Sequence, residues 1–158
     1  MSGLEIERKF LVKDDSYKQL SHSSSRIRQG YICSGHGRTV RVRLRDRSAF
    51  LTIKGPSRDG GLSRYEFEKE ITPEEAEQLF LLCEPGVIDK TRYLVRSGQH
   101  TFEVDEFYGE NAGLVMAEVE LSAPNEPYVA PSFIGDEVTG DRRYYNSYLR
   151  AHPFTRWE

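Results

Sequence analysis

Alternating charged residues near the start of the chain are the first feature that points to chemistry. Segment 5–9 reads Glu-Ile-Glu-Arg-Lys, which spaces Glu5, Glu7 and Lys9 two residues apart. Successive side chains of a β-strand point to opposite faces, so these three would share one face of a strand. Carboxylates bind divalent cations through oxygen, and lysine binds phosphate groups. The pattern therefore indicates a site for a ligand that carries several charges.

The same alternation of charged and apolar residues recurs along the chain. A site for phosphate alone would be basic, and a site for calcium alone would be acidic. A balanced set instead suits a polyphosphate that binds together with a divalent metal ion. Eight bases and eight acids follow the pattern, namely Lys9, Arg41, Arg43, Arg45, Lys54, Arg64, Lys90 and Arg92, and Glu5, Glu7, Glu66, Glu68, Glu103, Asp105, Glu118 and Glu120.

A single Glu-x-Glu pair has a simpler interpretation, because most such pairs lie on the solvated face of a sheet. Charged strands also deter sheets from pairing edge to edge. Here the pattern recurs on most expected strands, whose opposite faces are apolar enough to require burial. We therefore expect the charged faces to point inward. The alternative is an interaction protein whose charged face is exposed.

The periodicity predicts about eight strands and a mainly β, α+β fold. Short turns between consecutive strands favour antiparallel pairing. Eight strands form a closed barrel with room for side chains or one small ligand. We therefore predict a closed antiparallel barrel, or tunnel, with a charged interior and an apolar outside that helices or a partner subunit cover. The expected strands span 4–12, 26–33, 38–46, 49–54, 64–71, 87–96, 100–107 and 114–122.

One helix is clearly signalled by its first residues. Thr72 is a typical N-cap, Pro73 suits the first turn, and Glu75 completes a capping box. We expect it to end at Pro85-Gly86, and Ala76, Leu79, Phe80 and Cys83 give it an apolar stripe. A short helix is expected within 14–20 and a last helix from about Asp141. Segment 21–25 is interpreted as a surface loop, and 124–131 as a Pro-rich connection.

Composition limits the classes of protein that this chain can represent. Its 158 residues predict one domain, 1–158, and the net charge of -3 argues against a general nucleic-acid surface. No apolar run approaches the ~18 residues that span a bilayer, and the N-terminus lacks a signal-peptide pattern. Cys33 and Cys83 are isolated thiols without metal-binding spacing, which favours a reducing cytoplasm.

The chain resembles the CYTH superfamily, also called triphosphate tunnel metalloenzymes. Its N-terminal segment 5–10 looks like the Glu-x-Glu-x-Lys signature of that superfamily. The short length and this motif are most similar to the compact bacterial inorganic triphosphatases. The resemblance continues in order through Gln29-Gly30-Tyr31, Arg41-Val42-Arg43, Thr52-Ile53-Lys54, Gly61-Leu62-Ser63-Arg64, Glu66-Phe67-Glu68, Lys90-Thr91-Arg92-Tyr93, Glu118-Val119-Glu120 and Asp141-Arg142-Arg143-Tyr144.

The resemblance implies an eight-stranded tunnel that binds a triphosphate along its axis and hydrolyses it with Mg²⁺ or Mn²⁺. The implied metal ligands are Glu5, Glu7, Glu118 and Glu120. The implied phosphate binders are Lys9, Tyr31, Arg41, Arg43, Lys54, Arg64, Lys90, Arg92 and Arg143. Arg142-Arg143 stands where close relatives have Lys-Arg, a departure that keeps the charge.

We expect four side chains to act in catalysis. Lys9 and Lys90 would neutralise charge in the transition state, and Glu66 or Glu68 would orient the attacking water. The sequence does not choose between the two glutamates. It also leaves Arg45, Glu103 and Asp105 open between a role in the site and internal ion pairing.

Several other functions remain open at the level of sequence. Within the resemblance they are a class IV-type adenylyl cyclase and a nucleoside, thiamine or RNA triphosphatase. Outside enzymes, a non-catalytic polyphosphate-binding module is the main alternative, although eight inward acids would gain such a binder little. The expected partner is a small triphosphate, without nucleic acid or membrane. The apolar outer face also makes a homodimer a reasonable expectation.

Overall fold

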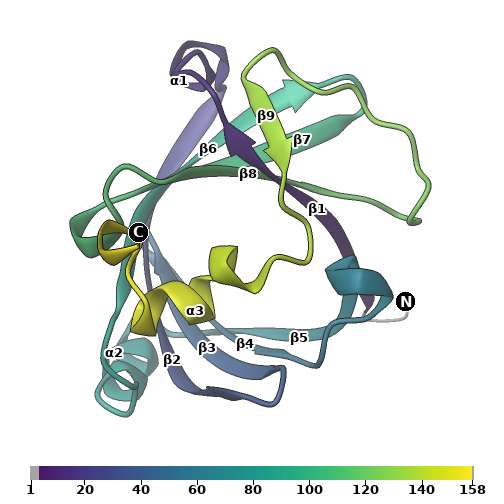
Figure 1. Ribbon diagram of the computed structural model, residues 1–158. Helices are drawn as coiled ribbons and strands as arrows, with labels where there is room; N and C mark the ends of the chain where they lie inside the picture. Colours follow the sequence, from purple (N-terminus) through teal and green to yellow (C-terminus); the bar gives the residue numbers. More distant parts are fainter. Residues whose placement is uncertain (1–3, 158) are drawn as a thin grey trace.

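A computed structural model describes residues 4–157, whose strands form a closed barrel seen end-on in Figure 1. Eight strands close the barrel in the order β1-β5-β4-β3-β2-β6-β7-β8, and β9 pairs with β1 outside it. All pairings between these strands are antiparallel. The strands are β1 (Leu4–Val12), β2 (Ser23–Gly35), β3 (Arg38–Arg45), β4 (Ser48–Lys54), β5 (Ser63–Ile71), β6 (Ile88–Ser97), β7 (His100–Phe107), β8 (Val115–Glu120) and β9 (Ile134–Glu137). The predicted eight-stranded antiparallel barrel is confirmed.

Strand β1 closes the barrel because it pairs with a different neighbour on each side along its length. Its first residues, 4–6, pair with β5, and residues 7–11 pair with β8. Its outer end also pairs with β9, with an irregular register between Phe10 and Val12. The N-terminal motif that carries Glu5, Glu7 and Lys9 therefore lies at the junction of the sheet.

The helices are short and lie outside the barrel or across one end of it. They are α1 (Tyr17–Leu20), α2 (Pro73–Phe80) and α3 (Asn146–Ala151), with 3-10 turns η1 (Asp59–Gly61), η2 (Gly109–Asn111), η3 (Arg142–Tyr144) and η4 (Phe154–Arg156). The capping box at Thr72 and Glu75 is present as predicted. In the described part of the chain, no helix has both the length and the apolar character that a membrane crossing requires.

Three expectations about local structure were wrong, and one strand was not expected. Helix α2 ends at Phe80 rather than at Pro85-Gly86, because the backbone hydrogen bonds of residues 81–83 reach back only three residues. Ser23–Ser25 belong to β2 rather than to a loop, because the long strand β6 supplies pairing partners as far as Leu94. The last helix begins at Asn146, after a 3-10 turn that Asp141 caps through the backbone N–H of Arg143. The short strand β9 gives no alternating pattern of its own in the sequence, and its pairing with β1 places it.

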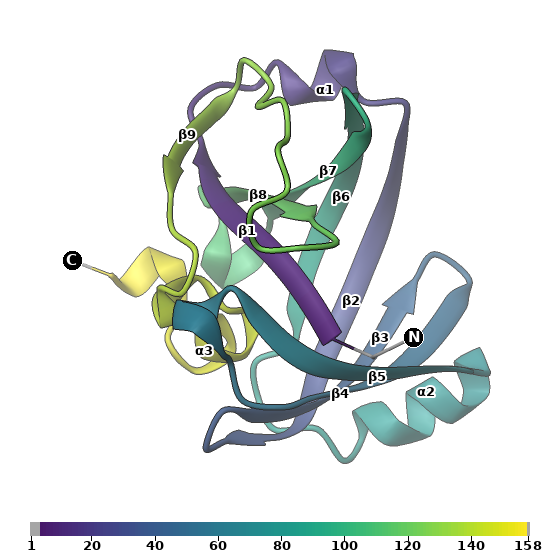
Figure 2. The ribbon, with the colours of Figure 1, turned by 90° about the vertical axis from the view of Figure 1, so that its right-hand side faces the viewer.

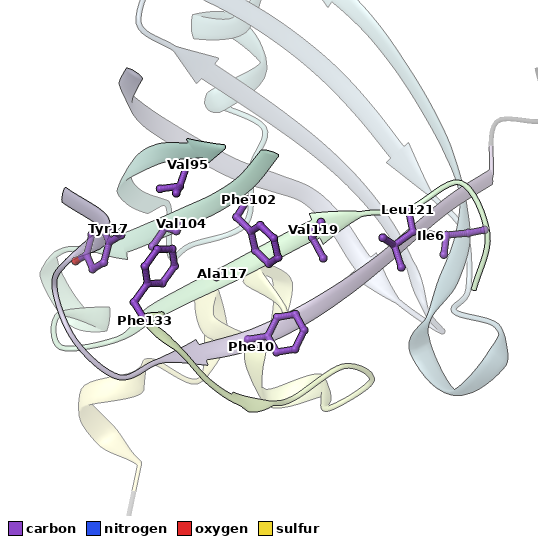
Figure 3. Packing of buried hydrophobic residues seen from close by; sticks show 10 residues of the cluster. All are labelled: Ile6, Phe10, Tyr17, Val95, Phe102, Val104, Ala117, Val119, Leu121 and Phe133. Atoms are coloured by element: carbon purple, nitrogen blue, oxygen red, sulfur yellow. The ribbon is translucent and has the colours of Figure 1, made fainter. Parts of the chain in front are cut away.

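The hydrophobic core lies outside the barrel and has three parts. The largest part covers β1, β7 and β8 with α1, β9 and the segment that precedes β9 (Figure 3). Phe102 and Phe133 are fully buried there. Burial of each such side chain contributes about 1.5–3 kcal/mol. The barrel interior is thereby left free for charged side chains.

The other two parts lie beneath the C-terminal segment and beneath α2. The C-terminal part includes Ile88, Phe107 and Leu149, and Ala76 of α2 packs over Val42 and Ala49. A Cβ on Gly30 of β2 would lie 2.9 Å from the sulfur of Cys83, so this close approach requires glycine. The apolar outer face is thus covered by this chain's own segments over most of the barrel.

One outer area remains partly exposed. Leu4 pairs with Tyr65, and Ile53 pairs with Phe67, so these four side chains lie on adjacent strands β1, β5 and β4. Their exposed fractions are between 40% and 47%. The expected homodimer stays a prediction. This patch, together with the exposed Leu81 and Leu82 after α2, is apolar surface that a second subunit could cover.

Candidate functional site

A cavity of about 230 Å³ occupies the barrel interior and is lined almost entirely by charged and polar side chains. The alternation of the strands places these side chains inside, because their apolar neighbours pack outward. Fourteen of the predicted site residues line it, namely Glu5, Glu7, Lys9, Tyr31, Arg41, Arg43, Lys54, Arg64, Glu66, Glu68, Lys90, Arg92, Glu118 and Glu120. Arg45 and Glu103 line it as well. The inward direction of the charged faces is therefore observed.

Arg143 is the predicted phosphate binder that the structure places outside the cavity. Its guanidinium is bound by the carboxylate of Asp141 at 2.7 Å, and its side chain is 58% exposed. It also lies over the rings of Tyr144 and Trp157. The turn that precedes α3 directs this side chain away from the barrel interior.

Acids and bases occupy opposite sides of the cavity. Neighbouring strands β7, β8, β1 and β5 carry the lining carboxylates, whereas β4, β3 and β6 carry most of the lining bases. Two bases, Lys9 and Arg64, lie on the acidic side. Such an arrangement presents one wall to an anion and the other to a cation.

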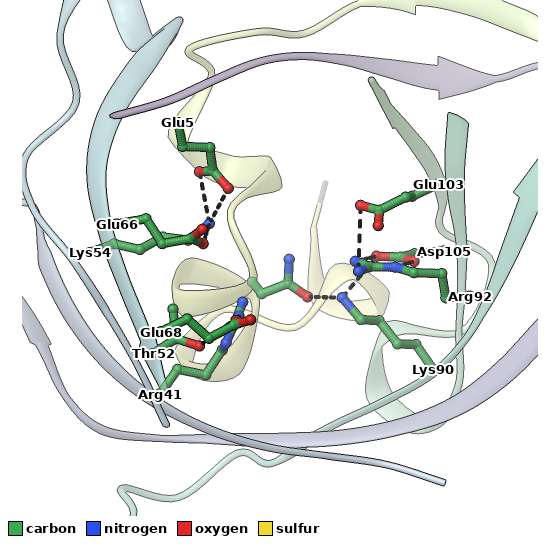
Figure 4. Close-up of polar contacts among 11 residues, drawn as sticks. Glu5, Arg41, Thr52, Lys54, Glu66, Glu68, Lys90, Arg92, Glu103 and Asp105 are labelled. Atoms are coloured by element: carbon green, nitrogen blue, oxygen red, sulfur yellow. Dashed lines mark hydrogen bonds and ion pairs between the residues drawn. The ribbon is translucent and has the colours of Figure 1, made fainter. Parts of the chain in front are cut away.

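Lys54 connects the two walls. Its ammonium lies 2.9 Å from Glu5 and 3.6 Å from Glu66 (Figure 4). Burial lowers the pKa of Lys54, but the attraction of Glu5 and Glu7 outweighs it and raises the pKa above the ordinary value. Lys54 therefore remains charged and holds two carboxylates toward the cavity.

A second connection runs through Thr52. Its hydroxyl donates to Glu68 at 2.9 Å and accepts a hydrogen bond from Arg41 at 3.2 Å. Arg41 and Glu68 are themselves 3.8 Å apart (Figure 4). The carboxylate of Glu68 is thus engaged by two partners, one through a hydrogen bond, whereas that of Glu66 has one ion-pair partner among residues 4–157, Lys54 at 3.6 Å.

Asp105 is the counterion of two buried bases. It binds Arg92 through two hydrogen bonds of 2.8 and 2.9 Å, and it lies 2.8 Å from the ammonium of Lys90. Burial raises the pKa of Asp105, but Arg92 and Lys90 outweigh it and hold the pKa below the ordinary value. Asp105 is not among the residues that line the cavity. Its observed contacts are internal ion pairs.

For Lys90, by contrast, burial outweighs the attraction of the carboxylate partner, so its pKa is lowered away from the charged form. Its pKa is lowered to about 7, mainly by burial; Arg92 and Arg43 act in the same direction, and Asp105 acts against them. Lys90 is 1% exposed, so water does not screen these charges. An anion in the cavity would favour the protonated form of this side chain.

The carboxyl groups of Glu7 and Glu118 contact each other on the acidic wall. Burial and the neighbouring Glu118 raise the pKa of Glu7 well above its ordinary value. Burial also acts to raise the pKa of Glu118, but Lys9 and a hydrogen bond from Glu7 hold it well below. A proton between the two carboxyl groups would relieve the repulsion of their charges. A divalent cation can take the place of such a proton.

Three arginines of the cavity, Arg43, Arg45 and Arg64, lack a carboxylate partner among residues 4–157, and two of them also have a buried nitrogen without a hydrogen bond. No Asp or Glu oxygen of the described residues lies within 4 Å of their guanidinium nitrogens. The buried nitrogen without a hydrogen-bond partner is the Nε of Arg43 and of Arg64. Burial and repulsion from Arg41 and Arg92 lower the pKa of Arg43, although a guanidinium remains charged in proteins. These unpaired cations are available to bind an anion.

The oxygen-only donors of the acidic wall fit a hard divalent cation such as Mg²⁺ or Mn²⁺. Glu7 and Glu118 are already hydrogen-bonded to each other, and Glu120 lies opposite Glu7 on the neighbouring strand. Burial and the nearby Glu5 raise the pKa of Glu120, as expected where carboxylates crowd together. Among residues 4–157, no three His, Cys, Asp or Glu side chains form a ready-made metal site. The four predicted ligands fit by their chemistry and their common wall.

Residues of the C-terminal segment also line the cavity, and the sequence did not indicate them. Tyr145, which precedes α3, and Asn146 and Ser147, the first two residues of α3, enter it. The amide oxygen of Asn146 accepts a hydrogen bond from Lys90 at 2.9 Å, and the carbonyl of Tyr144 accepts one from Lys9 at 3.1 Å. We expected this segment only as a helix. No periodic pattern could identify these residues, because they lie at the start of a helix of only six residues.

Comparisons with known proteins were made with this geometry in hand. The sequence matches the family model of the CYTH domain over residues 3–145. An inorganic triphosphatase of Acetivibrio thermocellus is 46% identical over 157 residues, 99% of each protein. An inorganic triphosphatase of Nitrosomonas europaea is 37% identical over 151 residues, 92% of this chain and 95% of that protein. A crystal structure of an inorganic triphosphatase is similar with a TM-score of 0.64 at 31% identity, covering 92% of this chain and 97% of the other.

Proposed function

This chain belongs to the CYTH domain family, and on that premise we propose that it hydrolyses inorganic tripolyphosphate to pyrophosphate and phosphate. The observation that carries the proposal is the barrel cavity in which unpaired bases face a wall of carboxylates. Two relatives that are similar over nearly their whole length are inorganic triphosphatases. The expected reaction adds one water across a phosphoric anhydride bond.

The basic wall would hold the substrate. Arg41 and Arg92 are buried and Arg43 is half-buried beside them, so a polyanion relieves their mutual repulsion. Charge-assisted hydrogen bonds from arginine to phosphate are among the stronger ones in proteins. Tyr31 lines the same cavity, with its hydroxyl accepting a hydrogen bond from Gln29. Most of the binding energy would therefore come from charges that are already in place.

The acidic wall would hold the metal ion. Glu5, Glu7, Glu118 and Glu120 are its ligands in this proposal, with Mg²⁺ and Mn²⁺ as the candidate ions. When bound, the ion would neutralise phosphate charge and stabilise the leaving pyrophosphate. Release of a proton held between Glu7 and Glu118 would accompany its binding.

The chain's own side chains would position the reacting groups. Lys9 and Lys90 would neutralise the charge that develops as water attacks the terminal phosphorus and the anhydride bond breaks. Glu66 is the better candidate to orient the water, because Thr52 and Arg41 already engage Glu68. A phosphorus–oxygen bond to water forms, pyrophosphate leaves with the bridging oxygen, and the proton of the water passes through Glu66 to solvent.

A phosphate-release panel tests the proposal directly. Tripolyphosphate, pyrophosphate, ATP and thiamine triphosphate would each be incubated with Mg²⁺, with Mn²⁺ and with EDTA. We expect the highest kcat/KM for tripolyphosphate with metal and none with EDTA. Cyclic AMP as the product from ATP would contradict hydrolysis as the function, and tight binding without turnover would indicate a binding module.

Location and assembly are further parts of the proposal. Cys33 and Cys83 are free thiols, which favours a reducing cytoplasm. A homodimer without nucleic acid is the proposed state, and light scattering of the purified protein tests it. A monomer over the full concentration range would contradict the dimer without affecting the proposed reaction.

A further inference from the structure

The barrel cavity is closed at one end by the C-terminal segment. Helix α3 and the turn before it cross this end of the barrel in Figure 1, and they lie at the same end in the side view of Figure 2. Tyr145, Asn146 and Ser147 are the residues of this segment that line the cavity. A chain of phosphates that enters the barrel therefore meets these residues at the far end.

Several contacts hold the closing segment in place. Lys9 and Lys90 donate hydrogen bonds to Tyr144 and Asn146, and the ring of Tyr145 lies 5.0 Å from the ammonium of Lys9. The segment before it packs tightly on η1, since a Cβ on Gly61 would lie 2.3 Å from the Cα of Gly140. The closed end is thus built from both backbone packing and side-chain contacts.

Basic side chains gather at this closed end. Lys9 and Lys90 contact the closing segment directly, and the guanidinium of Arg64 lies 5.4 Å from the ring of Tyr145. Arg64 has no carboxylate partner among the described residues. A free terminal phosphate carries more negative charge than an internal one, so these cations favour entry with a chain end first.

A second cavity, of about 460 Å³, lies on the other side of the closing segment. Thr39, Arg64, Tyr145 and Ser147 line both cavities and so form the wall between them. The second cavity is itself basic, with Arg38, Arg142 and Arg150 in its lining. Without the wall, a phosphate chain would find further cations in this direction.

We propose that Tyr145 and Asn146 act as a stop that determines which anhydride bond is cut. The inference rests on the proposed function and adds to it a rule for the substrate's position. A chain end would rest against the stop, held by Lys9, Arg64 and Lys90, and the phosphorus at that end would be attacked. The remaining phosphates would extend through the barrel away from the closing segment. Longer chains would then lose one phosphate at a time from their ends.

Tetrapolyphosphate distinguishes the positions because its two modes of cleavage have different products. Attack of water on the end phosphorus gives phosphate and tripolyphosphate, whereas attack on the next phosphorus gives two molecules of pyrophosphate. Tripolyphosphate gives phosphate and pyrophosphate from either end, so its turnover reports the proposed function alone. The ratio of the early products of tetrapolyphosphate, measured by ion chromatography, tests whether the stop sets the position of attack.

The variants for this experiment are Asn146→Ala and the double variant Tyr145→Ala with Asn146→Ala, with Tyr145→Phe as the matched control. We expect the wild type and Tyr145→Phe to favour phosphate and tripolyphosphate by about tenfold or more. In the double variant the phosphate chain should slide toward the second cavity, and the share of pyrophosphate among the products should therefore rise. Asn146→Ala should shift the ratio in the same direction and keeps the tight ring packing of Tyr145.

Two results would overturn the inference while tripolyphosphate turnover stands. One is an unchanged product ratio in Asn146→Ala and in the double variant, each shown to be folded by circular dichroism. The other is pyrophosphate as the main early product of the wild type. If the wild type did not hydrolyse tripolyphosphate, that result would instead contradict the proposed function.

Discussion

Lys90 and Asp105 form an ion pair of 2.8 Å between two side chains that are each at most 3% exposed. Asp105 also binds Arg92, so one carboxylate serves two bases that the barrel holds out of water. Burial and neighbouring arginines nevertheless lower the pKa of Lys90 to about 7. The protein therefore holds these bases in position before the substrate binds. Their burial costs desolvation free energy, which a bound polyanion offsets.

Binding of tripolyphosphate should be accompanied by proton uptake at Lys90. The pKa of Lys90 in the free protein is lowered to about 7, so at pH 8 this side chain is mostly neutral. A polyanion raises that pKa, and the sign of the coupled reaction is therefore uptake of protons. Calorimetry in EDTA, in buffers with different ionisation enthalpies, measures it for the wild type and for Lys90→Arg. Equal proton uptake by the wild type and by Lys90→Arg would show that Lys90 is not the group that takes up the proton.

Asp105→Asn should destabilise the protein strongly. Removal of one partner from a buried ion pair costs about 3–5 kcal/mol, because the remaining charges stay buried. The pKa of Asp105 is lowered in the folded state, so its contribution is complete above the ordinary carboxyl pKa and is lost as the pH falls. Urea unfolding at neutral pH and in acid should show a difference from the wild type that shrinks below about pH 4.

The control for that substitution is Glu110→Gln, which removes an exposed ion pair with Arg156. Exposed pairs contribute about 0–1 kcal/mol, so this variant should unfold almost like the wild type. An equal effect of the two substitutions would show that Asp105 is not the counterion that the buried bases require.

Arg43→Met should stabilise the free protein and weaken substrate binding. Arg43 has no carboxylate partner among residues 4–157, and burial with Arg41 and Arg92 disfavours its charge. Its removal should raise the melting temperature, whereas KM for tripolyphosphate should rise by about tenfold, equivalent to ~1.4 kcal/mol. A lower melting temperature together with an unchanged KM would contradict a role in binding. Arg156→Met, on the surface, is the control.

Glu120→Gln should abolish most hydrolysis without loss of the fold. The substitution removes one proposed metal ligand. Loss of a group that only supports a metal ligand already reduces metal affinity or activity by about 10–100-fold, so we expect at least that reduction here. Initial rates across a titration of Mn²⁺ measure it, with Glu137→Gln as a control because Glu137 pairs with Arg8 outside the cavity. Full activity of Glu120→Gln at limiting Mn²⁺ would exclude Glu120 as a ligand.

Much of the candidate site could be predicted from local pattern. Because a strand alternates its faces, the charges at Glu5, Glu7 and Lys9 had to share a side, whichever strands lay beside them. The same rule placed Arg41 and Arg43 together, and their apolar neighbours on the covered face. Repetition of the rule along the chain also predicted the number of barrel strands.

Arg143 and Asn146 show where this reasoning ended. Both lie in the segment before and within α3, where no period-two or helical pattern distinguishes inward from outward. The turn that Asp141 caps directs Arg143 to solvent, and Asn146 enters the cavity beside Lys90. The motif gave Arg143 as a phosphate binder, which stays a prediction, and gave no indication of Asn146 in the cavity lining.

The sequence by itself determined which side chains face the barrel interior, because alternation along a strand is a property of neighbouring residues. The tertiary structure alone decided which charges meet, because β1 pairs with β5 at residues 4–6 and with β8 at residues 7–11. That register gathers the acids on one wall, leaves Asp105 as an internal counterion and brings the C-terminal segment across one end. Contacts between residues as distant as Lys90 and Asn146 depend on closure of the barrel, which no local pattern encodes.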